Sequence, residues 1–487
     1  MKKIFAGFIL TVALFPLLRG QSDIDAFRFS QINREGSARF MGAGGALGAV
    51  GADFSAISVN PAAIAIFKKH EISITPLSVS VFSTQSTFNG TSTTTPRVRY
   101  TFPQVGLVMK APLQGDYWRG LYFGFGFNRI QDFNGRFNVE GRSKGHSMTE
   151  DLALGATADN FDPDNTTSGF YGTSNFAWDA YLINADPAWS SSNRKYVSAL
   201  NGFDLKQSRF VETRGGIDEM SFTVGANYGD KFFMAASVGI PFLNYTESST
   251  YTETDDKNET SVIDHFKFED KLKVSSVGIN LKLGIIYQPV SFMRLGISFQ
   301  TPTYYNSVHE IFERSMYARN DTGRVHSSSY SNENRYSLTT PLRASFNVAF
   351  LINRRGFISL EYEISNFAQA SMIARNYAFN EENRQIQAKY GLAHALRIGG
   401  EINVSEHFLL RAGYNYLTSP YKNGINDGSA HIASAGMGFR FSRFFFDLAY
   451  SLRLSREKYW IYSADLADAA SMDFARHRIY TTFGLKF

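Results

Sequence analysis

The chain has 487 residues, no cysteine, 44 phenylalanines and 25 tyrosines, and its mean hydropathy is −0.21. Without cysteine there are no disulfides, so packing or a closed hydrogen-bond network must hold the fold. The formal charge of +5 falls to +2 once Lys2, Lys3 and Arg19 are set aside, and no run of Lys and Arg is interleaved with aromatics, which argues against a nucleic-acid partner.

Residues 1–20 read "MKKIFAGFILTVALFPLLRG", with two lysines, an apolar core from Ile4 to Leu18 and a small residue at Gly20. This order is typical of a secretory signal peptide. We expect cleavage after Gly20, so that the exported chain begins at Gln21. No later apolar run approaches the ~20 residues that a membrane helix needs.

Residues 21–70 precede the first strand-like segment and include "RFMGAGGALGAVGADFSAISVNPAAIAIF" at 39–67. The stretch is too interrupted to be a strand and has too many glycines to be a stable helix by itself. Asn60 suits a helix N-cap and Pro61 suits the first helical position, where no N–H is needed. We therefore expect a short helix from Asn60 through Ile64 to Phe67.

From about residue 70 to the end the dominant pattern has period two, which predicts strands. In "HRIYTTFGLKF", for example, Ile479, Phe483 and Leu485 share one face, while Arg478 and Thr482 share the other. We predict fourteen strands, near 71–83, 98–110, 119–132, 217–228, 231–246, 263–287, 292–303, 335–352, 357–370, 386–404, 407–418, 431–441, 444–456 and 474–487.

Every second connection between these strands is tight, and the others are long and polar, the longest running from about 133 to 216. Short turns at one end and long loops at the other are the layout of an outer-membrane β-barrel, which must close because lipid offers no partner to backbone polar groups. We therefore expect residues 71–487 to form a 14-stranded antiparallel transmembrane β-barrel, in contact with lipid of a Gram-negative outer membrane. The terminal Phe487, in register with the apolar stripe, resembles the signature of proteins delivered to the barrel-assembly machinery.

Fourteen strands enclose a lumen too wide for wall side chains to fill, since about eight strands are nearly self-filling. Residues 21–70 would start in the periplasm at the mouth of the barrel and plug it. The stretch 36–67 resembles the N-terminal hatch of FadL/TodX-type transporters of hydrophobic compounds, in the form common in Bacteroidetes-like bacteria. The residues that carry the likeness, and that we expect to form the hatch and ligand site, are Gly42, Gly44, Gly45, Phe54, Asn60, Pro61 and Ala62.

This resemblance implies a hydrophobic small-molecule ligand and no cofactor. The ligand would be caught in an outer loop groove, pass to a pocket above the hatch, and leave sideways through a kink in the third strand. That strand carries Gly120, Gly124 and Gly126, and glycine inside a strand often marks a bulge or a close backbone approach. The alternative is that these glycines only make room for the hatch.

Within the long loop, Trp178, Tyr181, Leu182 and Trp189 are more apolar than an exposed loop needs. Large exposed apolar patches tend to be binding sites, so these residues are candidates for the loop groove. Packing of the loop onto the barrel rim is the equal alternative.

Two glutamates, Glu361 and Glu363, are two apart on one predicted strand, and Arg343 and Arg397 lie on the flanking strands. All four would point into the lumen. We expect an ion-pair ladder that stiffens the wall and anchors the hatch, rather than a catalytic site. No metal site is expected, because no paired histidine or EF-hand spacing occurs.

The sequence thus favours passive transport of hydrophobic small molecules, fatty-acid-like or aromatic, through a plugged barrel. A second hypothesis is a FadL-like barrel of a type IX secretion machine that binds cargo proteins. A third, an outer-membrane acyl hydrolase, is disfavoured because no nucleophile motif occurs in the strand-to-helix context it needs.

Overall fold

The computed structural model describes residues 23–113, 115, 117–164, 172–353 and 355–487. The predicted signal peptide, residues 1–20, lies outside the described residues. Among the described residues, no helix is both long and apolar enough to cross a bilayer.

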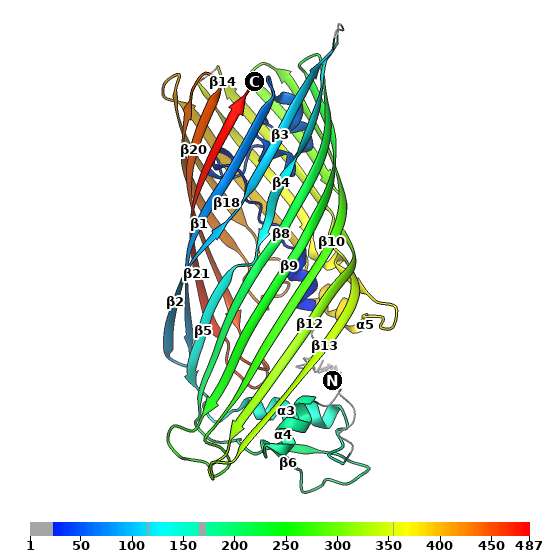
Figure 1. The fold of residues 1–487 in the computed structure, drawn as a ribbon, viewed down its shortest axis with the longest axis vertical. Helices are drawn as coiled ribbons and strands as arrows, with labels where there is room; N and C mark the ends of the chain where they lie inside the picture. The colour runs from blue at the N-terminus through cyan, green and yellow to red at the C-terminus, as the bar shows by residue number, and fades with distance from the viewer. Residues whose placement is uncertain (1–22, 114, 116, 165–171, 354) are drawn as a thin grey trace, which may run out of the picture.

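The fold is a closed antiparallel β-barrel (Figure 1). Closure is made by β21 (Ala470–Lys486), which pairs with β20 (Phe444–Tyr459) on one side and with β1 (Glu71–Phe88) on the other. The ring that results leaves no unpaired sheet edge at its closing strand, as a lipid environment requires.

Within the described residues, the barrel sheet has 19 strands that make up 14 wall positions, because five wall strands are interrupted and carry two labels each. The remaining wall strands, in chain order, are β2 (Thr91–Thr101) with β3 (Gln104–Pro112), β4 (Trp118–Asp132) with β5 (Gly135–Arg142), β8 (Lys206–Tyr228), β9 (Phe232–Thr254), β10 (His265–Val290), β11 (Met293–Gln300) with β12 (Tyr304–Arg319), β13 (Val325–Thr339) with β14 (Arg343–Ile352), β15 (Gly356–Asn366) with β16 (Ser371–Ile373), β17 (Leu392–Asn403), β18 (Phe408–Leu417) and β19 (Ala430–Arg440). The predicted fold class and strand number are confirmed.

The wall is apolar outside and polar inside, the reverse of a soluble protein. On β10 the outward residues from Val277 to Tyr287 are all apolar and exposed, while the inward Asn280 and Lys282 are buried. Eleven residues is the length that a tilted strand needs to cross a bilayer. Farther along the same strand, at 265–275, the outward residues are mostly charged, and we call this part of the wall the polar collar.

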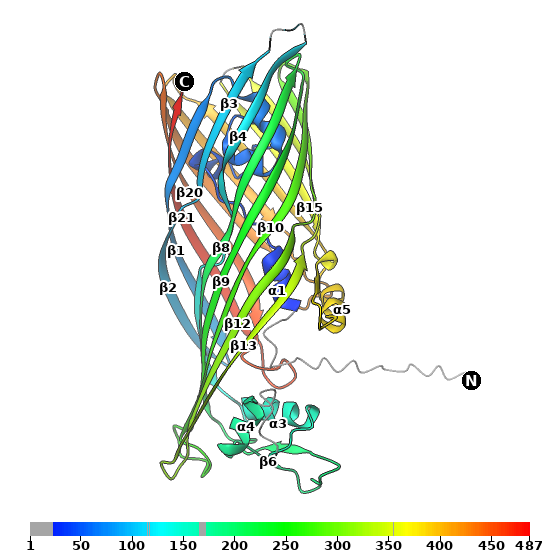
Figure 2. The same cartoon turned by 45° about the vertical axis from the view of Figure 1, so that its right-hand side comes forward.

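The tight connections lie at one end of the barrel and the long ones at the other (Figures 1 and 2). Three predicted boundaries were wrong. The first hairpin closes through Asn89 and Gly90, whose φ values of 46° and 86° fit a two-residue type I′ turn. The loop predicted over 133–216 spans 143–205, since β5 and β8 extend into it, and residues 386–389 belong to helix α5 (Asn380–Lys389).

The hatch fills the short-turn half of the lumen with α2 (Ala38–Gly42) and two 3₁₀ helices, η1 (Phe54–Ser58) and η2 (Pro61–Ile66). Its first helix, α1 (Asp23–Ser30), does not lie at the periplasmic mouth as expected. It lies toward the loop end, near α5 (Figure 2). There the ring centroids of Phe27 and Tyr390 lie 4.4 Å apart, and Lys389 of α5 pairs with Asp23 at 3.0 Å. The hatch therefore runs through the lumen from the loop side down to the start of β1.

Residues 143–164 and 172–205 form a cap over the loop end, with α3 (Met148–Ala158), α4 (Gly172–Asp179) and the small hairpin of β6 (Ile183–Ala185) and β7 (Tyr196–Ser198). A buried apolar cluster joins the cap to the wall: Leu152 and Phe176 pack with Phe266 and Phe268 of β10. The cap has a core of its own and shares it with the barrel rim.

Candidate functional site: hatch, wall interruption and lumenal cavity

The Asn-Pro-Ala triplet begins η2 as predicted. The Asn60 side-chain oxygen accepts from the Ala62 N–H at 3.0 Å, and its amide nitrogen donates to the Ile285 carbonyl of β10 at 3.4 Å. A Cβ on Gly284 would lie 2.0 Å from Asn60 Oδ1. Asn60 thus caps the helix and fits against a wall position that only glycine can occupy.

The other predicted hatch residues also meet glycines of the wall. Gly42 lies against Gly436, and Gly44, at φ 64°, lies against Gly413. Gly45, at φ 72°, instead turns toward the ring of Phe40 within the hatch. Backbone therefore packs directly on backbone, which requires the absence of side chains on both surfaces.

Phe54 projects from η1 into a recess formed by Gly106 of β3 and Gly126 of β4. A Cβ on Gly124 would lie 2.6 Å from Ile64 of the hatch. Gly124 and Gly126 face inward, as expected, and they make room for the hatch. Gly120 lies at a register shift near the short-turn end of β4, so none of the three marks the interruption of this strand.

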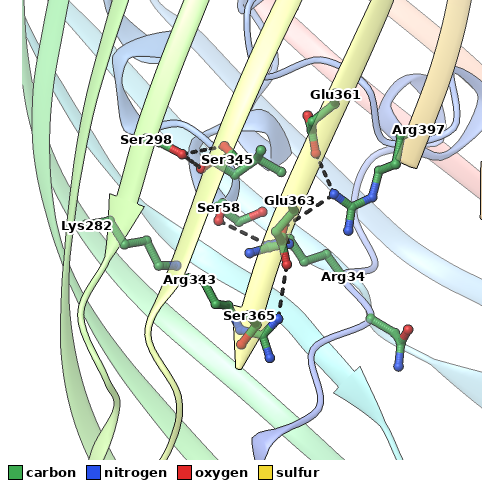
Figure 3. A network of polar contacts seen from close by, with 12 residues as sticks. Arg34, Ser58, Lys282, Ser298, Arg343, Ser345, Glu361, Glu363, Ser365 and Arg397 are labelled. Atoms are coloured by element: carbon green, nitrogen blue, oxygen red, sulfur yellow. Dashed lines mark hydrogen bonds and ion pairs between the residues drawn. The ribbon is translucent and has the colours of Figure 1, made fainter. Parts of the chain in front are cut away.

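The predicted ion-pair ladder is present and includes the hatch (Figure 3). Arg397 pairs with Glu361 at 2.6 Å, and Arg343 pairs with Glu363 at 3.0 Å. Arg34 of the hatch adds a 2.6 Å pair to Glu363. All of these side chains are nearly or fully buried, so the two carboxylates stabilise the wall and hold the hatch to it.

The third wall strand is interrupted at residues 133–134, between β4 and β5. The last backbone bond to its neighbour is from the Arg129 N–H to the Pro103 carbonyl, at 2.8 Å. Beyond it, in the described residues, β5 pairs with β8 but forms no ladder with β2. The Arg136 carbonyl instead accepts from Thr84, a lumen-facing side chain of β1, at 3.0 Å, so β5 bends to the inner side of the β1–β2 hairpin.

This bend leaves one edge of β2 without a strand partner among the described residues. Val98 and Tyr100 of β2 face outward and are 52% and 68% exposed. Pro96 lies in the same stretch, and proline is tolerated at strand edges because it has no N–H to donate. The sequence therefore suits an opening in the wall here.

The hatch is bonded to the wall at this interruption. The Glu35 N–H donates to the Arg129 carbonyl at 2.9 Å, and the Asn33 N–H donates to Gln131 Oε1 at 3.0 Å. The register of β4 against β8 shifts between Arg129 and Gln131. The hatch thus satisfies polar groups at the place where the strand leaves the wall.

A cavity of ≈ 240 Å³ lies on the lumenal side of the interruption. One part of its lining is aromatic, and another part carries Asp132, Arg453 and Arg476. This site could not be predicted from the sequence, because its arginines read only as members of a polar inner face. The aromatic residues are Phe82, Phe133, Phe137 and Phe474.

The four loop residues predicted to form a groove do not come together as one surface. Leu182 is fully buried, and Trp178 and Trp189 pack against the core of the cap. Tyr181 is 54% exposed. They pack the cap onto the rim, the alternative raised from the sequence.

A closed barrel with an apolar outer band, a polar lumen and an internal hatch is an integral outer-membrane barrel of a Gram-negative type. Its fold is that of the FadL- and TodX-type barrels. The structure is similar to that of a Pseudomonas aeruginosa FadL homologue, with a TM-score of 0.53 and 14% identity over 93% of this chain and 98% of that chain. It is also similar to the Pseudomonas putida toluene transporter TodX, with a TM-score of 0.51 and 12% identity over 93% and 98% of the two chains. No protein-family model and no curated protein matches the sequence.

Proposed function

We propose that the chain is a channel through which hydrophobic small molecules, fatty-acid-like or aromatic, diffuse passively across the outer membrane. The observation that supports it best is the interruption of the third wall strand beside the cavity of ≈ 240 Å³. A ligand would pass the cap, rest against the phenylalanines of this cavity, and leave between β2 and β5 into the bilayer. The hatch below would keep the lumen closed to polar solutes.

The solved structures with this fold include one named as a FadL homologue and one named as a toluene transporter, which is consistent with such a ligand. The proposal assigns no catalytic role, since Glu361 and Glu363 are held in ion pairs. Outer-membrane lipid and the barrel-assembly machinery are the further partners that it implies.

The test is uptake of radiolabelled oleate and toluene by cells that lack other carriers of these compounds, with and without the protein. Thr84 lines the cavity and is 2% exposed, so Thr84→Trp would fill the space and should reduce uptake at least tenfold. Val81→Trp, on the outer face of the same strand and 44% exposed, is the matched control. Mass spectrometry of the purified barrel should also find apolar molecules bound to it.

Uptake equal to that of cells without the protein would overturn the proposal. If deletion of the protein instead removed proteins from the cell surface and left uptake unchanged, the type IX secretion hypothesis would replace it.

A further inference from the structure

A groove of ≈ 370 Å³ runs across the outer face of the wall, over β8, β9 and β10, at the bilayer edge of the polar collar. Its two sides carry the long side chains of Arg214 on β8 and Lys271 on β10, which are 60% and 46% exposed. The short hydroxyl side chains of β9 lie between them and form its floor. We call this feature the basic groove, and its lining residues are Phe210, Glu212, Arg214, Thr246, Ser248, Thr250 and Lys271.

The register of the strands arranges the polar groups of the basic groove in two rows. Ser248 lies directly between Glu212 of β8 and Lys271 of β10. Thr246 lies directly between Arg214 of β8 and Lys273 of β10. Because neighbouring strands are about 4.8 Å apart, β8 and β10 are separated by about 10 Å. This spacing leaves room for one phosphate group that bonds to side chains on both sides.

One carboxylate of the basic groove is shared by four arginines. Glu212 pairs with Arg97 of β2 and Arg136 of β5 at 2.6 Å each, with Arg99 of β2 at 3.4 Å, and with Arg214 of its own strand. The carboxylate is nearly buried among these guanidinium groups. Within the described residues, the cluster therefore has three more positive charges than negative ones.

The neighbouring acids do not offset this excess. Lys271 and Lys273 share Glu313, at 3.9 and 3.4 Å, which adds a fourth surplus charge. The next carboxylate on β10, Glu269, pairs with Lys267 at 2.8 Å. The acids farther toward the loop end also have basic partners: Glu140 pairs with Lys206, and Asp204, Asp256 and Glu259 pair with Arg142 and Lys257. The surplus positive charge thus stays at the basic groove.

The basic groove lies at the depth of the lipid headgroups. Lys273 comes four residues beyond Val277, the exposed residue at which the apolar band of β10 ends. Four residues of a tilted strand rise roughly 10 Å, which is beyond the hydrocarbon core and within the headgroup layer. Clusters of lysine and arginine at this depth attract anionic lipid headgroups.

We infer that the basic groove binds the phosphate of a lipid headgroup in the outer leaflet, with Arg214 and Lys271 on its two sides and the hydroxyl of Ser248 beneath it. A guanidinium presents two parallel N–H groups to two phosphate oxygens, and a hydroxyl can donate to a third. The acyl chains of the lipid would lie along the apolar band, against Phe222 and Val224, which are exposed on the same face of β8. The inference concerns the outside of the barrel and does not depend on the proposed function.

Native mass spectrometry of the full chain in detergent tests this, with monophosphoryl lipid A and its phosphate-free form as probes. The wild type should bind the phosphorylated lipid at least tenfold more tightly than the other. Arg214→Gln with Lys271→Gln should abolish this preference and leave binding of the phosphate-free lipid unchanged, which also shows that the variant is folded. Arg214→Lys with Lys271→Arg keeps both charges and should keep most of the preference.

The matched control removes two exposed arginines elsewhere on the barrel, by Arg119→Gln with Arg456→Gln. Each of them pairs with one aspartate, Asp230 at 3.8 Å or Asp473 at 2.6 Å, and the preference of this variant should equal that of the wild type. A wild type without preference, a preference that survives in the groove variant, or an equal loss in the control would overturn the inference.

Inorganic phosphate distinguishes a lipid site from a site for a free anion. It should bind to the wild type at least tenfold more weakly than monophosphoryl lipid A, because it lacks the acyl chains that contact the apolar band. Equal affinity of the two probes would assign the basic groove to a free anion and overturn the inference.

Discussion

The ring of Phe54 in the hatch occupies the space in front of Gly106 in the wall. A Cβ on Gly106 would lie 2.1 Å from Phe54 Cγ, a distance that real carbon atoms do not reach. The hatch is therefore held in the barrel by shape as well as by charge, and the glycine is a packing requirement.

Gly106→Ala should push η1 away from the wall. Overpacking of this kind costs about 1–3 kcal/mol, and we expect lower thermal stability and faster leakage of a polar dye through the barrel. Phe54→Ala in the same chain should reverse part of both changes, because alanine lacks Cγ, Cδ1 and Cδ2, the three Phe54 atoms nearest the added methyl group. Gly155→Ala in α3, where a Cβ would meet nothing within 4 Å, should change neither property. Normal leakage in Gly106→Ala would show that the hatch does not depend on this fit.

Two substitutions of Asn60 separate the contribution of its hydrogen bonds to stability from the contribution of its shape. Asn60→Ala loses the helix cap, a cost of about 1 kcal/mol. Asn60→Gln keeps the amide but is too long for the space beside Gly284, where the native side chain already fills the position of a Cβ. We expect the glutamine variant to melt at a lower temperature than the alanine variant, as followed by the gel mobility of the folded barrel. The reverse order of melting temperatures would mean that the N-cap hydrogen bond of Asn60 contributes more to stability than its fit against Gly284.

The pair between Arg34 and Glu363 should hold the hatch in place. Glu363→Gln leaves Arg34 and Arg343 buried without their carboxylate, and breaking a buried pair in this way costs about 3–5 kcal/mol. We expect the hatch of this variant to become accessible to protease from the short-turn side while the barrel stays folded. Glu381→Gln is the control, since its pair with Arg384 is exposed and such pairs contribute about 0–1 kcal/mol. Protection equal to that of the wild type in Glu363→Gln would contradict the anchoring role.

Docking of the cap should strengthen as the pH falls. The pKa of Asp151 in α3 is raised to about 6, chiefly by burial and also by the nearby acids Glu150 and Asp465, although its bond from the Ser463 N–H opposes the shift. Because the folded cap binds a proton that the undocked cap releases, its stability declines as the pH rises from about 4 through about 6, by at most about 3 kcal/mol. After correction for the intrinsic pH dependence of amide exchange, the protection factors of residues 148–158 should therefore be higher at pH 5 than at pH 7.

Asp151→Asn should make these protection factors independent of pH over the same range, because the amide oxygen can still accept from the Ser463 N–H but does not titrate. A pH dependence unchanged in Asp151→Asn would assign the effect to another group.

The bilayer-spanning part of the fold could be predicted because lipid and lumen impose opposite demands on alternate residues. Ile479 and Phe483 are about half exposed while Tyr480 and Thr482 are fully buried, and this contrast is visible in the sequence. The polar collar gives no such contrast, since both faces meet water. Apart from Val325, the residues of β13 up to Tyr336 all carry polar groups, so the length of this strand could not be predicted.

The candidate site was predicted only where its signal is local. Asn60 and Pro61 predict a helix start because asparagine is a favoured N-cap residue and proline a favoured first helical residue. The spacing of Glu361 and Glu363, two apart on one strand, places both in the lumen. The lumenal cavity depends instead on what β20, β21 and the third wall strand bring together, which no sequence spacing encodes. The interruption at residues 133–134 could not be predicted either, because the sequence places the end of the third strand at 132 and assigns the residues of β5 to the long loop.

The polar collar raises the mouth of the barrel far above the bilayer. Eleven residues of β10, tilted as barrel strands are, stand roughly 25–30 Å beyond the apolar band. By the proposed route, a solute that enters beneath the cap would cross the layer of hydrated lipid headgroups and sugars inside the barrel, surrounded by the polar collar. By the proposed route, a hydrophobic solute would bypass the charged surface layer of the membrane and would first meet lipid beside Val98 and Tyr100.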